Sequence, residues 1–403
     1  MKILMVNKFL YPRGGCETYM LTLAEELMAK GHEVEYFGMY DDNNTVGNSA
    51  GLYTTNMDFH SKGLARFLYP FKIIYSSEAK RKLGKVLDEF RPDVVHMNNI
   101  NFQLTPSVIY AVKKRGIPLV QTVHDYQMIC PNHLLYSFGE VKPCERCIGG
   151  SKLNCLKYSC IHGSKAKSLI GAIEAKLYGL LKTYKKVDLY ICPSTFLEEK
   201  LLSADELYRG KTLALHNFIE KKPLPEMTAP EKPYVAFASR LSKEKGVTLL
   251  YEAAKMLPEY SFLVAGSGPD GDCLKEVPNI TMKGFLTGDE LVSLMANARV
   301  MLLPSVWYEN CPLSILETHS FGVPVITMNS GGMAELVEDG KTGALINEPT
   351  PEAVAEAIRR CFEDEKYYNT LKENCETMRD KIIGVSEYCD IVLAKYQELI
   401  DQR

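Results

Sequence analysis

The sequence predicts an α/β protein made of two doubly wound domains, each with a parallel sheet covered by helices. Three observations lead to this fold class. The chain has 403 residues, more than one hydrophobic core usually organises. Short apolar segments alternate with longer amphipathic segments along its whole length. A stretch with four prolines, residues 216–233, separates this alternation into two series, and each series predicts a sheet of its own.

The first series contains five segments with almost no polar residues, which is typical of parallel strands buried on both faces. They are Ile3–Val6, Val34–Phe37, Val94–Met97, Leu119–Val123 and Leu189–Cys192. The second series predicts strands at Val235–Ala238, Phe262–Ala265, Ile280–Met282, Val300–Leu303 and Val323–Ile326. Between strands, apolar residues at helical spacing predict helices such as Glu17–Lys30, Val247–Leu257 and Asp289–Ala298.

The proline-rich stretch places the predicted domain boundary. We expect an N-terminal domain over residues 1–215, with an insertion at 126–165, and a C-terminal domain over 216–383. Residues 384–403 contain a last helix whose apolar positions repeat at helical spacing. Because the second domain is complete without this helix, we expect it to pack back on the N-terminal domain.

Composition excludes several classes of protein. The chain is 46% hydrophobic, which argues against disorder, and its 47 basic and 50 acidic residues leave no excess positive charge for nucleic acid. No apolar run approaches the ~18–20 residues of a membrane-spanning helix. The N-terminus, MKILMVNKF, leads directly into a strand and predicts no signal peptide. We therefore expect a cytoplasmic protein whose thiols are mostly reduced.

Two glycine-rich turns follow predicted strands. Gly14 and Gly15 precede the first helix, and Gly266 and Gly268 follow the strand at Phe262–Ala265. Glycine lets the backbone approach a ligand closely, and the start of a helix attracts phosphate. The alternative for the first pair is a tight turn that needs positive φ. The first turn is not G-x-G-x-x-G, which weakens the interpretation as a nicotinamide dehydrogenase.

Two further positions follow predicted strands. His124 comes directly after the fourth strand, where ligands bind in parallel sheets, although it could also be a helix cap or a packing residue. Arg240 and Lys245 follow the first strand of the second series. A guanidinium and an ammonium are complementary ways to hold phosphate oxygens, and a solvated basic turn is the alternative.

The most informative segment joins a strand to a helix at residues 303–317. Pro312 suits the first position of a helix, and free amides near Leu313 would face a ligand. Glu309 lies in the loop and Glu317 lies eight residues later. Carboxylates accept hydrogen bonds from vicinal sugar hydroxyls, so both could contact one ligand together with Asn310.

The Gly14-Gly15 turn, the Ser239-Arg240…Lys245-Gly246 segment and the Glu309…Glu317 pair resemble the retaining glycosyltransferases of family four, over nearly the whole chain. That resemblance implies the GT-B fold, with both sheets facing an interdomain cleft. It also implies roles for the residues. Gly15, Arg240 and Lys245 would hold the donor diphosphate, Glu317 the ribose and Glu309 the sugar hydroxyls. His124 would line the sugar pocket, while Ser239 and Cys311 depart from the family pattern.

The resemblance further implies the reaction. The enzyme would move a sugar from a UDP- or GDP-sugar to a glycan or lipid-linked acceptor, building a surface polysaccharide or glycolipid, without a catalytic metal. Developing charge on the leaving phosphate would be held by Arg240, Lys245 and helix N-termini. The alternatives are an epimerase or inverting transferase of the same fold, and a non-catalytic nucleotide-binding assembly protein.

The insertion is rich in cysteine, with five of the twelve thiols in the 31 residues 130–160. The spacing of Cys144, Cys147, Cys155 and Cys160 is compatible with a structural zinc site. Free thiols are the alternative.

Two basic segments predict contact with an anionic membrane. Residues 142–186 contain ten Lys or Arg and two acids, a local net charge of +8, and residues 62–85 contain seven Lys or Arg. Apolar residues lie among them, including Phe67, Leu68, Phe71, Leu169, Ile170 and Ile173. We expect peripheral binding at the inner face of the plasma membrane, and a solvated helical face is the alternative.

Overall fold

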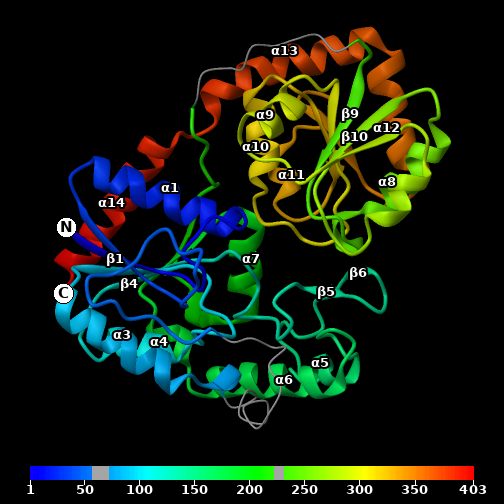
Figure 1. Cartoon of the computed structure of the whole chain (residues 1–403). Coiled ribbons are helices and arrows are strands. Elements are labelled where there is room, and N and C mark those ends of the chain that lie inside the picture. Colours follow the sequence, from blue (N-terminus) through cyan, green and yellow to red (C-terminus); the bar gives the residue numbers. More distant parts are fainter. Residues whose placement is uncertain (57–71, 222–230) are drawn as a thin grey trace. The chain divides into compact units, whose positions relative to one another are not determined.

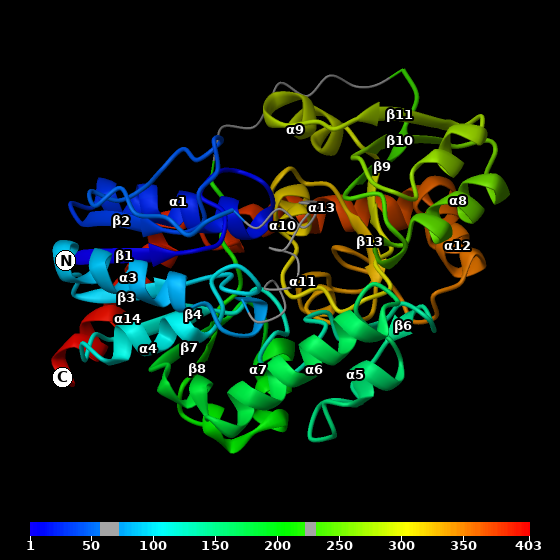
Figure 2. The same cartoon turned by 60° about the horizontal axis from the view of Figure 1, so that its bottom comes forward.

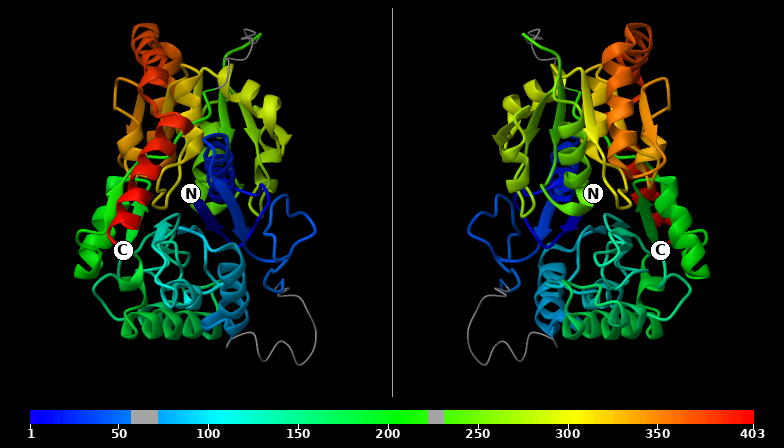
Figure 3. Two further views of the ribbon diagram at one scale, coloured as in Figure 1. Left: turned by 90° about the vertical axis from the view of Figure 1, so that its left-hand side faces the viewer. Right: turned by 90° about the vertical axis from the view of Figure 1, so that its right-hand side faces the viewer.

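The computed structural model describes residues 1–56, 72–221 and 231–403. These residues form two compact units. The first consists of Met1–Gly139, Cys144–Asn217 and Val385–Arg403, and the second of Phe218–Gly384 with Glu140–Pro143. Both chain ends therefore belong to the first unit (Figure 3). Phe67, Leu68 and Phe71 of the predicted membrane contact and residues 222–230 of the predicted linker lie outside the described residues.

In the described part of the first unit, six parallel strands form a sheet in the order β2-β1-β3-β4-β7-β8. They are β1 (Lys2–Val6), β2 (Glu33–Phe37), β3 (Val94–Met97), β4 (Leu119–Thr122), β7 (Leu189–Cys192) and β8 (Thr212–Ala214). The residues of β3 and β4 are buried throughout, which is why these strands lack the polar alternation of a half-exposed strand.

Helices cover both faces of this sheet, with α1 and α14 on one face and α3 and α4 on the other (Figure 1). The α-helices that lie wholly within the described residues of this unit are α1 (Gly15–Ala29), α3 (Ser77–Phe90), α4 (Ser107–Lys113), α5 (Asn154–Lys157), α6 (Lys165–Leu180), α7 (Thr195–Ala204) and α14 (Val385–Asp401). α14 contributes buried Tyr388, Val392 and Tyr396 and packs against α1, where Lys30 and Asp390 form an ion pair of 2.7 Å.

In the described part of the second unit, six parallel strands follow the order β11-β10-β9-β12-β13-β14. They are β9 (Tyr234–Ala238), β10 (Ser261–Ala265), β11 (Ile280–Gly284), β12 (Val300–Leu303), β13 (Val325–Met328) and β14 (Gly343–Ile346). The helices are α8 (Val247–Met256), α9 (Gly288–Ala296), α10 (Leu313–Ser320), α11 (Met333–Leu336), α12 (Pro351–Glu363) and α13 (Glu365–Lys381). α8 and α12 pack together on one side of the sheet (Figure 1).

The prediction of two parallel sheets is confirmed, and their strand orders locate the ligand-binding edges. In the first sheet β1 lies between β2 and β3, so the chain passes from β1 to β2 on one side and then crosses to β3 on the other. In the second sheet β9 lies in the same way between β10 and β12. Ligands of doubly wound sheets bind beyond the carboxyl ends of the strands at such switch points.

The cysteine-rich segment has little regular structure. Its strands β5 (Tyr136–Ser137) and β6 (Lys142–Pro143) have two residues each, and α5 lies beside α6 (Figure 2). Hydrogen bonds from side chains to the backbone help to hold the segment together. Lys152 Nζ donates to the carbonyls of Ile129 and Cys147 at 2.8 and 2.7 Å, and Asn154 Nδ2 donates to that of Arg146 at 2.8 Å.

Candidate functional site

The switch point of the second sheet brings together three of the predicted residues. Arg240 follows β9, Lys245 ends the 3-10 turn Lys243–Lys245, and Glu309 lies in the loop after β12. Lys245 Nζ donates to Glu309 Oε1 at 2.5 Å, and its ammonium lies 4.9 Å from the centroid of the Trp307 ring. A cation and a carboxylate far apart in sequence thus meet at the edge where a ligand is expected.

Glu309 is a buried carboxylate that stays ionised. Burial raises its pKa, but the Lys245 ammonium and hydrogen bonds that include one from Ser305 outweigh burial and leave that pKa below its ordinary value of 4.5. Ser305 Oγ donates to the same Oε1 at 3.0 Å. The loop is tied down as well, because the Glu309 carbonyl accepts a bond of 2.7 Å from the amide of Gly332.

Arg240 also has a carboxylate partner, Glu244. The Arg240 guanidinium pairs with Glu244 Oε1, which accepts a second hydrogen bond from Ser242 Oγ at 2.7 Å. The carboxylate is buried, whereas the Arg240 side chain is 60% exposed. Sequence reasoning missed both Glu244 and Ser305. The position of Glu244 between two lysines of a basic turn is the one signal that could have indicated a counter-ion.

Glycines at this edge allow loops to pack closely. A Cβ on Gly266 would lie 1.9 Å from the carbonyl oxygen of Ser239, and one on Gly268 would lie 2.2 Å from that of Leu241. The loops after β9 and β10 therefore pack backbone against backbone, with Leu241 N donating to Ser267 O at 3.0 Å. This packing requires both glycines whether or not a ligand binds.

The remaining predicted residues of the second unit lie on the loop and helix after β12. Helix α10 begins at Leu313, so Pro312 is the residue before the helix and not its first residue; its extended backbone (ψ 119°) is the reason. Pro312 supplies no capping side chain to the first amides of the helix. Asn310 is half-buried in the loop, and Glu317 is half-buried in the second turn of α10.

The predicted residues Gly14, Gly15 and His124 belong to the first unit. Gly14 precedes α1 with an extended backbone (φ −164°), and Gly15 is not among the residues with positive φ, so the alternative of a left-handed turn is wrong. Asn7, which sequence reasoning missed, holds this turn. Its Nδ2 donates to Phe9 O at 2.8 Å and to Glu17 Oε1 at 3.1 Å.

His124 follows β4 and is held by its neighbours. Its Nε2 lies 2.9 Å from Asn98 Oδ1, and its ring meets the Tyr19 ring edge to face at 5.0 Å between centroids. Burial lowers the pKa of His124 to about 3, so the imidazole is neutral at pH 7. A neutral ring can both donate and accept hydrogen bonds.

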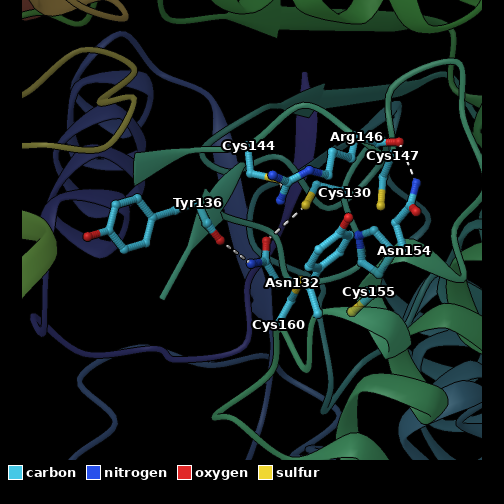
Figure 4. A pocket seen from close by; sticks show the side chains of 11 residues that line it. Cys130, Asn132, Tyr136, Cys144, Arg146, Cys147, Asn154, Cys155 and Cys160 are labelled. Atoms are coloured by element: carbon cyan, nitrogen blue, oxygen red, sulfur yellow. Dashed lines mark hydrogen bonds between the residues drawn. The ribbon is translucent and has the colours of Figure 1, made fainter. Parts of the chain in front are cut away.

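The cysteine-rich segment forms a separate pocket in which thiols lie close together. Five thiols line it, together with Arg146 and Asn132 (Figure 4): Cys130, Cys144, Cys147, Cys155 and Cys160. Among the residues that the structure describes, no three or more His, Cys, Asp or Glu side chains are arranged to hold a metal ion. The zinc site predicted at Cys144, Cys147, Cys155 and Cys160 stays a prediction, and all four thiols line this pocket.

Local hydrogen bonds hold two of these thiols. Cys144 Sγ accepts a long hydrogen bond (3.7 Å) from Arg146 Nη1, and Cys130, which the prediction leaves out, enters the pocket and donates to Asn132 Oδ1 at 2.8 Å. Burial raises the pKa of Cys130 to about 12, which keeps its thiol protonated. None of the twelve cysteines, all of which lie in the described residues, forms a disulfide bond.

Similar proteins have related sequences and the same architecture. The family model described as Glycosyltransferase Family 4 matches residues 13–222, and that described as Glycosyl transferases group 1 matches residues 219–378. A 42.6 kDa protein in the cps region of Klebsiella pneumoniae is 24% identical over 83% of this chain and 87% of its own.

Two solved structures share the fold over nearly all of both chains. Sucrose-phosphate synthase from Thermosynechococcus elongatus has a TM-score of 0.73 at 16% identity and covers 100% of both chains. HepE from Anabaena, in complex with UDP-glucose, has a TM-score of 0.68 at 18% identity and covers 98% of this chain and 100% of its own. The two parallel sheets and their helices are thus those of an α/β glycosyltransferase with the GT-B fold. More narrowly, the chain belongs to glycosyltransferase family 4.

Proposed function

We propose that this glycosyltransferase moves a sugar from a UDP- or GDP-sugar to a glycan or lipid-linked acceptor. The observation that carries the proposal is the Lys245–Glu309 pair at the switch point of the second sheet. The UDP-glucose bound by the similar Anabaena HepE supports a nucleotide-sugar donor. The cps region that contains the Klebsiella relative supports a role in making a surface polysaccharide.

In this mechanism the cations neutralise the donor diphosphate. Arg240 is exposed and can turn toward phosphate, while Lys245 has three N–H donors, of which Glu309 takes one. As the sugar leaves, negative charge grows on the terminal phosphate. Fixed donors aimed at such charge are each worth about 2.7–4 kcal/mol in other enzymes. The amides at the start of α10, the Gly14-Gly15 turn before α1 and the turn at Gly266 and Gly268 add further donor contacts.

The carboxylates would recognise the two sugars of the donor. Glu309 Oε1 already accepts from Lys245 and Ser305, so we expect Oε2 to accept from the hydroxyls of the transferred sugar. Glu317, with Asn310, Pro312 and Leu313 before it, would contact the ribose side of the nucleotide. His124 would contact the transferred sugar as a neutral imidazole.

We expect retention of anomeric configuration, with the acceptor attacking the face that the phosphate leaves and its proton passing to the leaving phosphate oxygen. No divalent metal is needed in this scheme. The test is transfer from UDP- and GDP-sugars with the product anomer assigned by NMR, with and without EDTA. A retained anomer in EDTA agrees with the proposal, and an inverted anomer or a C4- or C2-epimerised donor supports the alternatives. Binding without any release of UDP or GDP would support a non-catalytic assembly protein.

We further propose that the first unit contacts an anionic membrane through α6. Apolar side chains there are exposed beside exposed lysines: Leu169, Ile173, Leu180 and Leu181 beside Lys165, Lys167, Lys176 and Lys182. Such a surface combines apolar insertion with attraction to acidic headgroups. None of the helices in the described ranges is long and apolar enough to span a bilayer, so contact would be peripheral. A lipid-linked acceptor would be met at this surface.

A further inference from the structure

A chain of hydrogen bonds crosses the core of the first unit and begins and ends on α14. Tyr396 Oη lies 2.5 Å from His96 Nδ1, and His96 Nε2 lies 2.7 Å from Thr122 Oγ1. Thr122 Oγ1 lies 3.0 Å from Tyr19 Oη, which lies 2.9 Å from Tyr388 Oη. We call these five side chains the α14 network. All of them are at most 1% exposed.

The hydrogen bonds of the network can all run in one direction. Burial lowers the pKa of His96 to about 3, so its ring is neutral, with one nitrogen donating and the other accepting. Each hydroxyl has one hydrogen to donate. A run from Tyr396 to Tyr388, or the reverse, gives each of the four hydrogen bonds one donor and one acceptor. Removing one hydroxyl leaves a buried neighbour without a hydrogen-bond partner, which lowers the stability of the fold.

The network contacts the predicted sugar-binding histidine through Tyr19. The Tyr19 and His124 rings meet edge to face, with 5.0 Å between centroids and 70° between planes. Tyr19 is itself fixed on its other side by the Tyr388 ring at 5.7 Å and 90°. Thr122, the last residue of β4, stands two residues before His124. The imidazole therefore lies between Asn98, which bonds its Nε2, and a tyrosine whose position depends on α14.

We propose that Tyr19 and Tyr388 are positioning residues for sugar transfer, and that the C-terminal helix α14 holds the His124 ring in its working orientation through them. This inference rests on the proposed role of His124 at the donor sugar. It assigns the last helix of the chain a function in the reaction beyond completing the first unit. Figure 1 shows α14 beside α1, the helix that carries Tyr19.

The kinetic test uses Tyr388→Phe and Tyr19→Phe, which keep the rings and remove the hydroxyls. A less ordered imidazole lowers the fraction of productive complexes, so kcat should fall threefold to tenfold while KM for the donor stays within twofold. Tyr190→Phe is the matched control. Tyr190 is equally buried on β7 and donates to Tyr184 O at 2.5 Å. It pairs with Gln121 of β4, so its side chain lies on the face of the sheet opposite to that of Thr122 and outside the α14 network. It should lower Tm and leave kcat unchanged; an equal fall of kcat in the control would overturn the proposal.

A double-mutant cycle shows whether Tyr388 acts through His124. Adding Tyr388→Phe to His124→Ala should cause no further loss of kcat, and a full additional loss would overturn the proposal. Imidazole 15N NMR gives a readout besides activity. The His124 resonances should shift in Tyr388→Phe and not in Tyr190→Phe, and an unshifted spectrum would also overturn it. Wild-type transfer by His124→Ala would instead contradict the proposed function, while the NMR shift would still decide whether α14 positions the ring.

Discussion

Two buried carboxylates, Glu309 and Glu244, set the charge balance around the predicted phosphate-binding cations. Glu309 remains a carboxylate because Lys245 neutralises it, and Glu244 is kept in place by Arg240 and Ser242. Without a ligand, each predicted phosphate-binding cation thus has a carboxylate partner. A diphosphate would compete for these cations, and its own charge would then be offset by groups that the protein already holds in position.

Buried histidines predict how stability depends on pH. Native His96 stays neutral down to about pH 3, whereas an unfolded histidine binds a proton below about pH 6.5. Protons therefore favour the unfolded state as pH falls through 6.5. For His96 alone the free energy of unfolding should decrease by about 1.4 kcal/mol per pH unit below that value. Urea unfolding between pH 7.5 and 5 measures this slope, which His96→Gln should reduce; an unchanged slope would contradict the assignment.

Helix α8 begins in a place where only glycine fits. Gly246 has φ +79°, and a Cβ there would lie 2.0 Å from the carbonyl oxygen of Pro304, directly after Lys245 and beside the loop that carries Glu309. Gly246→Ala should lower the free energy of unfolding by more than about 3 kcal/mol. The new Cβ would force the Pro304 backbone to move, and the positive φ would strain the alanine itself. Gly340→Ala is the control, since Gly340 has φ +70° with no neighbour within 4 Å. It should cost only about 1–2 kcal/mol.

Thermal unfolding compares the stability of the two glycine variants. A titration with UDP shows whether the clash at Gly246 also displaces Lys245 and the loop that carries Glu309. We expect UDP affinity to fall in Gly246→Ala alone. Equal destabilisation of both variants would mean that the close approach to Pro304 has no energetic consequence.

Helix α6 is the element on which the membrane proposal depends. Leu180 is 74% exposed and Leu181 49% exposed at its end. Replacing both with serine should reduce binding to vesicles of phosphatidylcholine with one-third phosphatidylglycerol several-fold, as measured by co-sedimentation at low salt. Phe285→Ser removes an equally exposed apolar side chain (73%) from the second unit and should leave binding unchanged. Equal binding to pure phosphatidylcholine vesicles would contradict the proposal.

On the scale of the whole molecule, the two sheets can be predicted from the sequence more completely than the contacts of the site. The strands at Val94–Met97 and Leu189–Cys192 match their predicted bounds, because strands buried on both faces have unbroken apolar sequences. The edge strands β8 and β14 were missed, since they are short and half-buried and β14 begins with Gly-Ala. Their pairing depends on neighbours that are distant in the sequence.

The contacts of the site also depend on residues that are distant in the sequence. Residue type and the position after a strand were enough to select Lys245 and Glu309, but their pairing is a tertiary contact across 64 residues. The donor Ser305 becomes visible only in three dimensions, and the counter-ion Glu244 has only its place between two lysines as a signal in the sequence. In the cysteine-rich segment, spacing alone does not show that Cys144 accepts a hydrogen bond from Arg146 or that Cys130 lines the same pocket.

The central claim is that cations at the switch point of the second sheet hold a nucleoside diphosphate, and calorimetric titration with UDP and GDP tests it most directly. Arg240→Ala and Lys245→Ala should each weaken binding of the preferred nucleotide at least tenfold, about 1.4 kcal/mol. Lys243→Ala, a matched change at an exposed position of the same turn, should stay within twofold of the parent protein. Parent-like affinity in both Arg240→Ala and Lys245→Ala, or no nucleotide binding by the parent protein, would contradict the claim.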